Sequence, residues 1–169
     1  ADKYAPDKKL VYNQNGGMQT PMWEKLKETV MYLKSKGQRV DGIGWQGHLM
    51  NNQGLKQFVE NLDEELKKLS DLIDWAHSNK LEFHITELDY YNDGENNIYN
   101  SVKKQAEVYQ KLMNLLQEKS KNGLVTVNFW SMGERISSRG KKGHYMSIYD
   151  NDTIPTKTYE VVKKFINFD

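Results

Sequence analysis

Two carboxylates close a short apolar run in the middle of the chain, where residues 83–89 end in Glu87 and Asp89. Successive side chains of a strand point to opposite faces, so Phe83, Ile85 and Glu87 are expected to share one face. A carboxylate at the end of an apolar row costs free energy unless the strand end opens into a polar site. Taken alone, this run is equally compatible with a functional carboxylate and with a solvated surface acid. Other parts of the sequence are needed to choose between the two interpretations.

A second polar group follows a strand-like run at residues 40–49. Alternation places Gly44, Gln46 and His48 on one face of that run, and we expect this face to match the one that carries Glu87. Two other apolar runs end in a polar or aromatic side chain, namely Asn13 and Trp130. If the strand ends meet at one edge of a sheet, these residues bring an amide, an imidazole, a carboxylate and an indole together. This set suits a sugar ligand, because the amide and the imidazole can bind hydroxyl groups and the indole can stack on the sugar ring. The carboxylate would then face the anomeric carbon.

The elements that must position these residues alternate along the chain. Strand-like runs at 9–13, 40–49, 81–87 and 124–130 are each followed by an amphipathic helical stretch. This order predicts an α/β fold with a parallel sheet and right-handed crossovers. No glycine-rich phosphate loop follows any strand, which weakens a nucleotide-binding open sheet. The rival is a (β/α)₈ barrel, which needs about 250 residues, so four units are half of one.

Helix boundaries and core residues can be predicted from local signals. Thr20 followed by Pro21 is a favoured helix start, and Gly37 is expected to end that helix. Three tryptophans are expected to pack beneath or along the helices, namely Trp23, Trp45 and Trp75.

The composition excludes several classes of protein. The 169 residues carry 24 basic and 23 acidic side chains, a net charge of +1, so nothing favours nucleic acid or an anionic membrane surface. No apolar run approaches the length of a membrane span, and the absence of cysteine excludes disulfides and thiolate chemistry. No cofactor or metal is expected, since no histidine has a second ligand at metal-binding spacing.

Four motifs resemble one family in the order of its strands. Residues 40–49 closely resemble the sixth-strand motif of glycoside hydrolase family 10, the retaining endo-β-1,4-xylanases, and residues 85–89 resemble its seventh-strand nucleophile motif. Residues 10–13 and 127–130 are similar to its fifth and eighth strands. The resemblance covers nearly the whole chain but only strands 5–8. It implies one partial catalytic domain over 1–169, the C-terminal half of a TIM (β/α)₈ barrel whose N-terminal half is absent.

The resemblance also implies a role for each of these polar and aromatic residues at the strand ends. Glu87 would be the nucleophile that attacks the anomeric carbon, and His48 would orient it. Asp89 would be a supporting acid rather than a second catalyst. The implied substrate-binding positions are Asn13, Gln46 and Trp130.

The chain also departs from the family pattern. Retaining hydrolysis needs two carboxyl groups about 5 Å apart, one of them an acid/base. In the family the acid/base is a glutamate that ends the fourth strand, and nothing in this chain resembles its motif. Gln14 stands where an aspartate is usual, Ser138 stands where a second cleft tryptophan is expected, and residues 133–134 replace a small residue and an aspartate. We therefore expect negligible xylan hydrolysis by this chain alone.

Two functions from different classes remain. The first is an enzyme that cleaves internal β-1,4 bonds of xylan, with this chain supplying the nucleophile half of the site. The second is a non-catalytic polysaccharide-binding or scaffold remnant without an acid/base. Xylan or xylo-oligosaccharide is the expected partner, and a half-barrel exposing two strand edges and half a core would need its N-terminal half or self-association. Because polymeric xylan lies outside the cell, a secreted, periplasmic or cell-surface location is expected.

Overall fold

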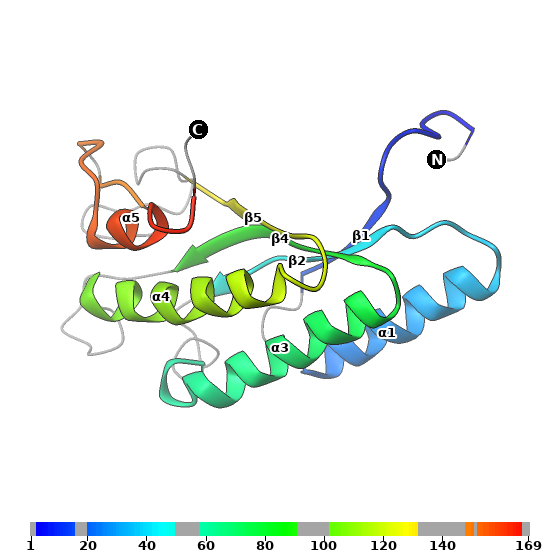
Figure 1. Cartoon of the computed structure of the whole chain (residues 1–169), viewed down its shortest axis with the longest axis horizontal. Coiled ribbons are helices and arrows are strands. Elements are labelled where there is room, and N and C mark those ends of the chain that lie inside the picture. The colour runs from blue at the N-terminus through cyan, green and yellow to red at the C-terminus, as the bar shows by residue number, and fades with distance from the viewer. Residues whose placement is uncertain are drawn as a thin grey trace.

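A parallel sheet with helices packed against one face carries the polar strand ends (Figure 1). The computed structural model describes residues 3–15, 20–49, 58–90, 102–131, 148–150 and 152–166. Along the chain the elements are β1 (Val11–Gln14), α1 (Thr20–Ser35), β2 (Gly42–Trp45), β3 (His48–Leu49), α3 (Leu62–Ser78), β4 (Glu82–Tyr90), α4 (Val102–Lys119), β5 (Val125–Phe129) and α5 (Lys157–Val162).

The strands pair in the order β1, β2, β4, β5, and every pairing is parallel. The two-residue strand β3 follows β2 after a break at Gln46 and Gly47, and it also pairs with β4. Parallel neighbours require a crossover, and the chain supplies one through α1, α3 and α4 in turn. The predicted α/β fold with a parallel sheet is confirmed.

The helices form where the sequence signals placed them. Helix α1 begins at Thr20 and ends at Ser35, and the expected stop residue Gly37 has the positive φ of 71° that glycine adopts without strain. Helix α3 carries three acidic residues in its first turn, which favours that end because the helix dipole is positive there.

The core lies between the sheet and the helices. Trp45 of β2 is 1% exposed and packs edge-to-face on Trp23 of α1, with ring centroids 6.2 Å apart. Both were expected in the core, and both are buried. Trp75 is only partly buried, because its ring lies against the core on one side and near the Lys27 ammonium, 5.9 Å away, on the other.

The opposite face of the sheet bears polar side chains rather than the apolar half-core expected from the sequence. His84 Nδ1 lies 2.8 Å from Thr126 Oγ1, and the Thr86 hydroxyl donates to Asn13 Oδ1 at 3.0 Å. The two glycines of β2, Gly42 and Gly44, share this face with those side chains, since a Cβ on either would meet them. The open face therefore has little apolar surface to hide from water.

Strand β4 contains one residue more than its neighbours at the point where the site forms. From Ile85 to Asp89 it advances four residues, while the facing chain advances three, from Trp45 to His48. The pairing with β5 shifts register between Ile85 and Leu88 as well. Such a bulge re-aims the side chains that follow it.

The bulge corrects one expectation. Phe83 and Ile85 are fully buried beneath the helices, and so are Leu88 and Tyr90, which restart the alternation one residue out of step. Glu87 therefore does not share the face of Phe83 and Ile85, because strict alternation does not hold across the extra residue. It lies instead on the open face, where His48 of β3 meets it.

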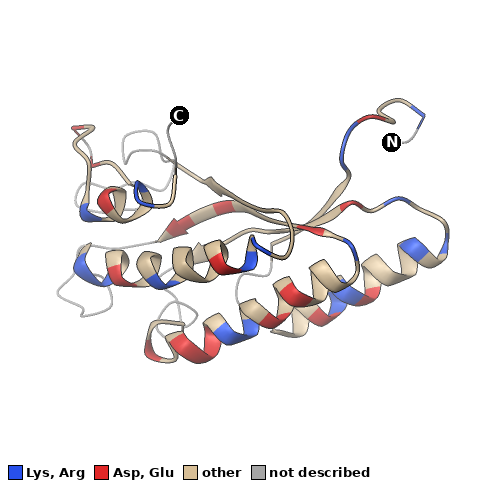
Figure 2. Ribbon diagram, viewed as in Figure 1, with Lys and Arg blue, Asp and Glu red and all other residues tan. Residues whose placement is uncertain are grey.

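Acidic and basic residues are mixed along the helices, and β4 is the strand of the described sheet that carries acidic residues (Figure 2). Within the described residues, no helix combines the length and the apolar composition that a bilayer crossing requires.

Candidate active site at the carboxyl ends of the strands

His48 joins two carboxylates at the carboxyl end of the sheet. Its Nε2 lies 3.0 Å from Glu87 Oε2, and its Nδ1 lies 3.0 Å from Asp89 Oδ1. Asp89 is completely buried, whereas the Glu87 side chain retains 18% of its exposure and the His48 side chain 14%. The imidazole therefore bridges a buried acid and an acid that reaches the surface of the site.

The backbone explains why these groups meet. The register pairs His48 with Asp89 directly, so their side chains are cross-strand neighbours. Gly47 precedes His48 in a close approach to β4, where a Cβ would lie 3.1 Å from Ile85 Cγ2 and 3.3 Å from Leu88 Cδ1. A glycine at this position lets the chain pass tightly over the bulge.

The two contacts limit how His48 can be protonated. An imidazolium ring donates from both nitrogens and so satisfies two ionised carboxylates at once. A neutral ring donates from one nitrogen only, so the carboxyl group that faces the other nitrogen would have to carry the proton. In both cases the ring plane is fixed from two sides, and Glu87 is held by one of its two oxygens.

Trp130 packs against the imidazole of His48. Its ring centroid lies 5.6 Å from that of His48 with the planes at 88°, an edge-to-face contact. Its backbone N–H donates to the carbonyl of Leu88 at 3.0 Å, which ties it to the end of β4. Because Trp130 is 45% exposed, indole surface remains open to solvent beside Glu87.

The two predicted amide residues occupy neighbouring strands. Asn13 lies on β1, is exposed and accepts a hydrogen bond from Thr86, the residue before Glu87. Gln46 lies in the break between β2 and β3, is partly buried and donates its backbone N–H to the carbonyl of Gln14. The structure thus unites four predicted residues through side-chain contacts, His48 with Glu87, Asp89 and Trp130. Gln46 lies two residues before His48 and its carbonyl accepts the His48 backbone N–H at 2.9 Å, whereas Asn13 lies on β1, with β2 between it and β4.

Sequence reasoning missed Thr86 as a member of this group. A threonine inside a strand is unremarkable in sequence, and its partner Asn13 is 73 residues away along the chain. The departures noted at Ser138 and at residues 133–134 lie outside the described residues.

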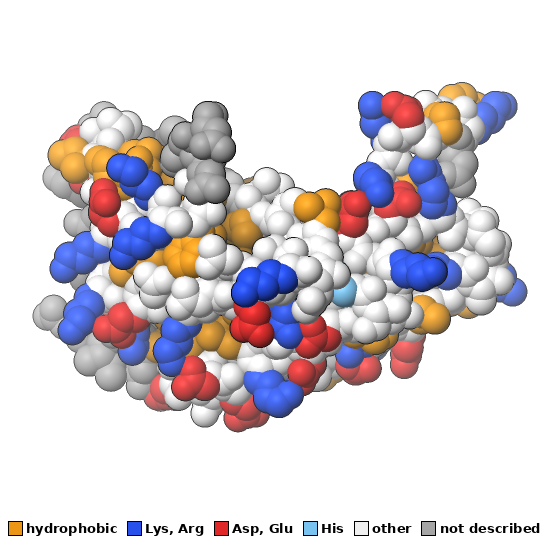
Figure 3. Space-filling model, in the orientation of Figure 1, with side chains coloured by type: hydrophobic (Ala, Val, Ile, Leu, Met, Phe, Trp, Pro, Cys, Tyr) orange, Lys and Arg blue, Asp and Glu red, His pale blue; other side chains and the backbone are white. Residues whose placement is uncertain are grey.

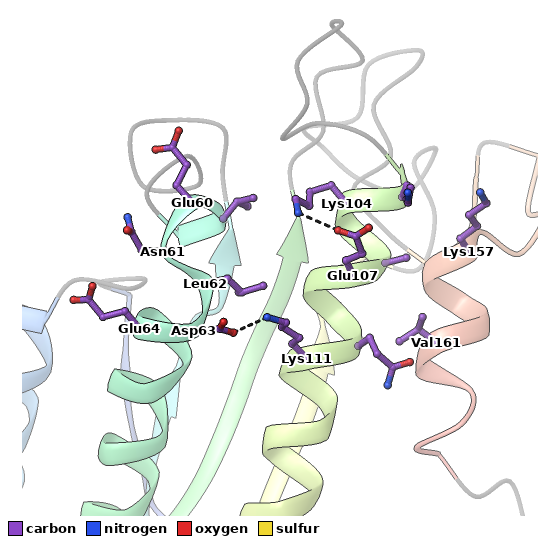
Figure 4. Close-up of a pocket in the computed structure, with 14 residues that line it drawn as sticks. Glu60, Asn61, Leu62, Asp63, Glu64, Lys104, Glu107, Lys111, Lys157 and Val161 are labelled. Atoms are coloured by element: carbon purple, nitrogen blue, oxygen red, sulfur yellow. Dashed lines mark hydrogen bonds and ion pairs between the residues drawn. The ribbon is translucent and has the colours of Figure 1, made fainter.

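A cavity of about 780 Å³ lies away from this site, among the first turns of α3, α4 and α5 (Figure 4). Its rim is charged and partly paired internally, with Lys111 2.6 Å from Asp63 and Lys104 3.0 Å from Glu107. None of the residues that line this cavity is His48 or one of its contact partners Glu87, Asp89 and Trp130. Among the described residues, no cluster of three or more histidine, cysteine or acidic side chains could hold a metal ion.

Fold and site together define a class of protein. Four βα units with a parallel sheet form part of a (β/α)₈ barrel, and the polar group lies at the carboxyl ends of the strands, where such barrels place their active sites. The site combines a carboxylate and an exposed indole, which together can offer a sugar a charged acceptor and a stacking surface.

Comparison with known proteins identifies the family. The family model for glycosyl hydrolase family 10 matches residues 1–165, so the chain belongs to this family. A β-1,4-xylanase of Dictyoglomus thermophilum is 28% identical over 98% of this chain and 47% of its own length. Endo-1,4-β-xylanase A of Thermoanaerobacterium saccharolyticum is 31% identical over 78% of this chain and 10% of its own length.

Solved structures agree on the fold. An endo-1,4-β-xylanase from Caldicellulosiruptor owensensis superposes with a TM-score of 0.76 at 22% identity, over 96% of this chain and 50% of that one. A psychrophilic family 10 endo-β-1,4-xylanase superposes with the same TM-score at 25% identity, over 100% of this chain and 48% of that one. The chain therefore spans half or less of the length of these relatives, and its fold is part of their TIM barrel.

Proposed function

We propose that this chain supplies the nucleophile half of a retaining endo-β-1,4-xylanase site. The observation that carries the proposal is the Glu87 Oε2 to His48 Nε2 contact of 3.0 Å beside the exposed ring of Trp130. Family membership supports a glycoside hydrolase, and several relatives are xylanases. A fold neighbour, the intracellular xylanase of Thermoanaerobacterium saccharolyticum, was solved as a mutant in complex with xylotetraose.

The proposed reaction gives each residue a task. His48 holds Oε2, so Oε1 is the oxygen of Glu87 that attacks the anomeric carbon and forms the glycosyl-enzyme bond. The leaving sugar oxygen takes a proton from the acid/base as its bond to that carbon breaks. Water, which gives a proton back to the acid/base, then attacks the anomeric carbon, breaks the glycosyl-enzyme bond and returns Glu87 to its ionised form. Trp130 offers a stacking surface for the sugar, while Asn13 and Gln46 bind hydroxyl groups.

The second carboxyl group of the pair must come from a complementary set of strands. We propose that four further βα units close the barrel between β1 and β5 and bring the acid/base to Glu87. Without them the chain would keep the nucleophile and its orienting histidine but would lack the proton donor, so it would not hydrolyse xylan.

The test joins this chain to the four preceding units of a family 10 barrel, in one polypeptide or as a second chain, and measures xylan hydrolysis. In the active form, Glu87→Gln should lower kcat by about 10³-fold or more, because the amide cannot form the glycosyl intermediate. Glu82→Gln is the matched control, since Glu82 is on the same strand, pairs with Lys9 and lies outside the site. Proton NMR of the first product should show retained anomeric configuration.

The outcomes separate the two functions. Undiminished hydrolysis in Glu87→Gln would show that another residue is the nucleophile. A joined form that binds xylotetraose but hydrolyses nothing would favour the non-catalytic binding role. Robust hydrolysis by this chain alone would refute the need for a second half.

A further inference from the structure

We infer that Thr86 is a positioning residue that orients the side-chain amide of Asn13 toward the sugar. This inference rests on the proposed function and adds to it a residue that acts through another. The Thr86 hydroxyl donates to Asn13 Oδ1 at 3.0 Å and lies 3.2 Å from the backbone carbonyl oxygen of Trp45. Three adjacent strands, β1, β2 and β4, therefore meet at one hydroxyl group (Figure 1).

The direction of this bond decides which end of the amide faces outward. A hydroxyl carries one hydrogen, which Thr86 shares between two acceptors, and the contact with Asn13 Oδ1 at 3.0 Å is shorter than the one with the Trp45 carbonyl at 3.2 Å. With Oδ1 engaged, the NH₂ group of Asn13 becomes the free end of an exposed side chain. Within the described parts of the chain, Thr86 is the hydrogen-bond partner of the Asn13 side chain. Asn13 therefore presents two N–H donors, which match the oxygen atoms of sugar hydroxyls.

Close packing keeps the amide in this orientation. A Cβ placed on Gly44 would lie 2.7 Å from Asn13 Oδ1 and 3.0 Å from Thr86 Cγ2. The register pairs Asn13 with Gly44, and a Cβ on Gly44 would touch both Asn13 and Thr86, so the bond between these two side chains passes over the glycine. Only a residue without a side chain lets β1 and β4 share a hydrogen bond across β2.

The position of Thr86 links this bond to the chemistry. Thr86 directly precedes Glu87 and belongs to the stretch in which β4 carries its extra residue. The same short segment thus supplies the nucleophile to the site and the hydroxyl that sets Asn13. A sugar bound by Asn13 would be placed relative to the same backbone that places Glu87.

The experiment uses the 169-residue chain and two readouts. Two-dimensional NMR of the side-chain NH₂ group of Asn13, assigned by its loss in Asn13→Asp, reports the orientation and mobility of the amide. Calorimetry with xylotetraose as the probe reports sugar affinity. Thr86→Val removes the hydroxyl at nearly constant shape, and Thr86→Ser is the matched control because it keeps the hydroxyl.

We expect Thr86→Val to shift and sharpen the Asn13 NH₂ resonances as the amide becomes mobile, and to weaken xylotetraose binding about three- to tenfold. Thr86→Ser should retain the wild-type resonances and stay within about twofold in affinity. Asn13→Asp should also lose affinity, because its carboxylate still accepts from Thr86 but has no N–H to offer the sugar. Near-UV circular dichroism identifies any variant that fails to fold.

The NMR readout tests the positioning role of Thr86, and the binding readout tests the sugar site, so each hypothesis can be rejected on its own. Unchanged Asn13 resonances in folded Thr86→Val would overturn the positioning role whatever the sugar does. An Asn13→Asp variant that binds xylotetraose as well as wild type would also overturn it, because the amide nitrogen would then not face the ligand. Altered resonances in Thr86→Val with no measurable sugar binding by the wild-type chain would support the positioning role and count against the proposed function.

Discussion

Both ring nitrogens of His48 contact carboxylates, one of Glu87 and one of Asp89. The second contact affects how the ring can stabilise Glu87 during the proposed reaction. Asp89 is completely buried and contacts Nδ1, so an imidazolium at this position keeps a fixed counter-charge. In the proposed reaction Glu87 loses its charge when it becomes an ester. Asp89 would then still balance the ring, which is a physical reason for two acids on one strand when only one attacks the sugar.

Trp130 should contribute to sugar binding as well as to packing. The residue is 45% exposed and meets His48 in an edge-to-face contact, so part of the indole is open to a ligand while the rest is buried. Aromatic contacts contribute about 0.5–1.5 kcal/mol beyond area burial, so Trp130→Ala should weaken xylotetraose binding about three- to tenfold in a variant that still unfolds cooperatively in urea. Calorimetry and urea titration of the same samples measure both. Tyr32→Ala, at a 61% exposed aromatic residue on α1, is the control.

A large stability loss in Trp130→Ala without loss of sugar affinity would reassign the residue to packing. The edge-to-face contact with His48 would then be its main role, and the exposed face of the indole would have no ligand to bind.

At the scale of elements, the sequence predicts those helices and strands that follow from the spacing of apolar residues and from the residues that start and stop helices. The alternation of strand and helix, the helix start at Thr20 and the stop at Gly37 all follow from local chemistry, and the structure agrees. The sequence also predicted that several polar residues gather at the ends of the strands, because parallel strands bring their carboxyl ends to one edge of the sheet.

The bulge in β4 could not be predicted, because alternation counts residues and assumes a regular backbone. The extra residue is visible only in the registers with two neighbours, Trp45 to His48 on one side and Val127 to Phe129 on the other. The same limit explains why Glu87 was placed on the wrong face although its neighbour His48 was named correctly. The Thr86 bond was hidden for a related reason, since it depends on the exact stacking of three strands.

Two buried tyrosines beneath the site make stability depend on alkaline pH. Burial, and then the charges of Asp89 and Tyr90, raise the pKa of Tyr109 on α4 well above its ordinary value of 10.0. Burial, and then the charge of Glu107, raise the pKa of Tyr90 as well. Above about pH 10 the unfolded chain loses these phenolic protons while the folded chain keeps them, so the free energy of unfolding falls as pH rises.

The expected slope is about 1.4 kcal/mol per pH unit for each buried phenol above its ordinary pKa. Urea unfolding between about pH 8 and about pH 11 measures it, and Tyr109→Phe should flatten the decline because one ionisable group is gone. Tyr32→Phe is the matched control, because it removes the hydroxyl of an exposed tyrosine on α1. Parallel curves for wild type and Tyr109→Phe would contradict the assignment.

At the scale of the whole molecule, the sheet ends in two edges. Among the described residues, β1 pairs only with β2, and β5 pairs only with β4. Beside β5 lies a groove of about 340 Å³ with apolar walls that include Met113, Val127 and Phe165. Figure 3 shows hydrophobic side chains gathered between α4 and α5 on this side of the molecule. A closed barrel would cover both edges, whereas this chain alone presents unpaired backbone groups to any strand that fits.

We therefore expect the isolated chain to self-associate through its edges rather than through the open face, whose side chains are polar. Val11 on β1 is 37% exposed, and Val11→Lys places a charge on that edge, which should shift sedimentation velocity profiles toward the monomer. Met31→Lys makes the same change of charge at a 46% exposed position on α1 and should leave association unchanged. A wild-type chain that sediments as a compact monomer at every concentration would contradict the argument. Adding the four complementary units should suppress association too, because pairing β1 and β5 in a closed barrel removes both edges at once.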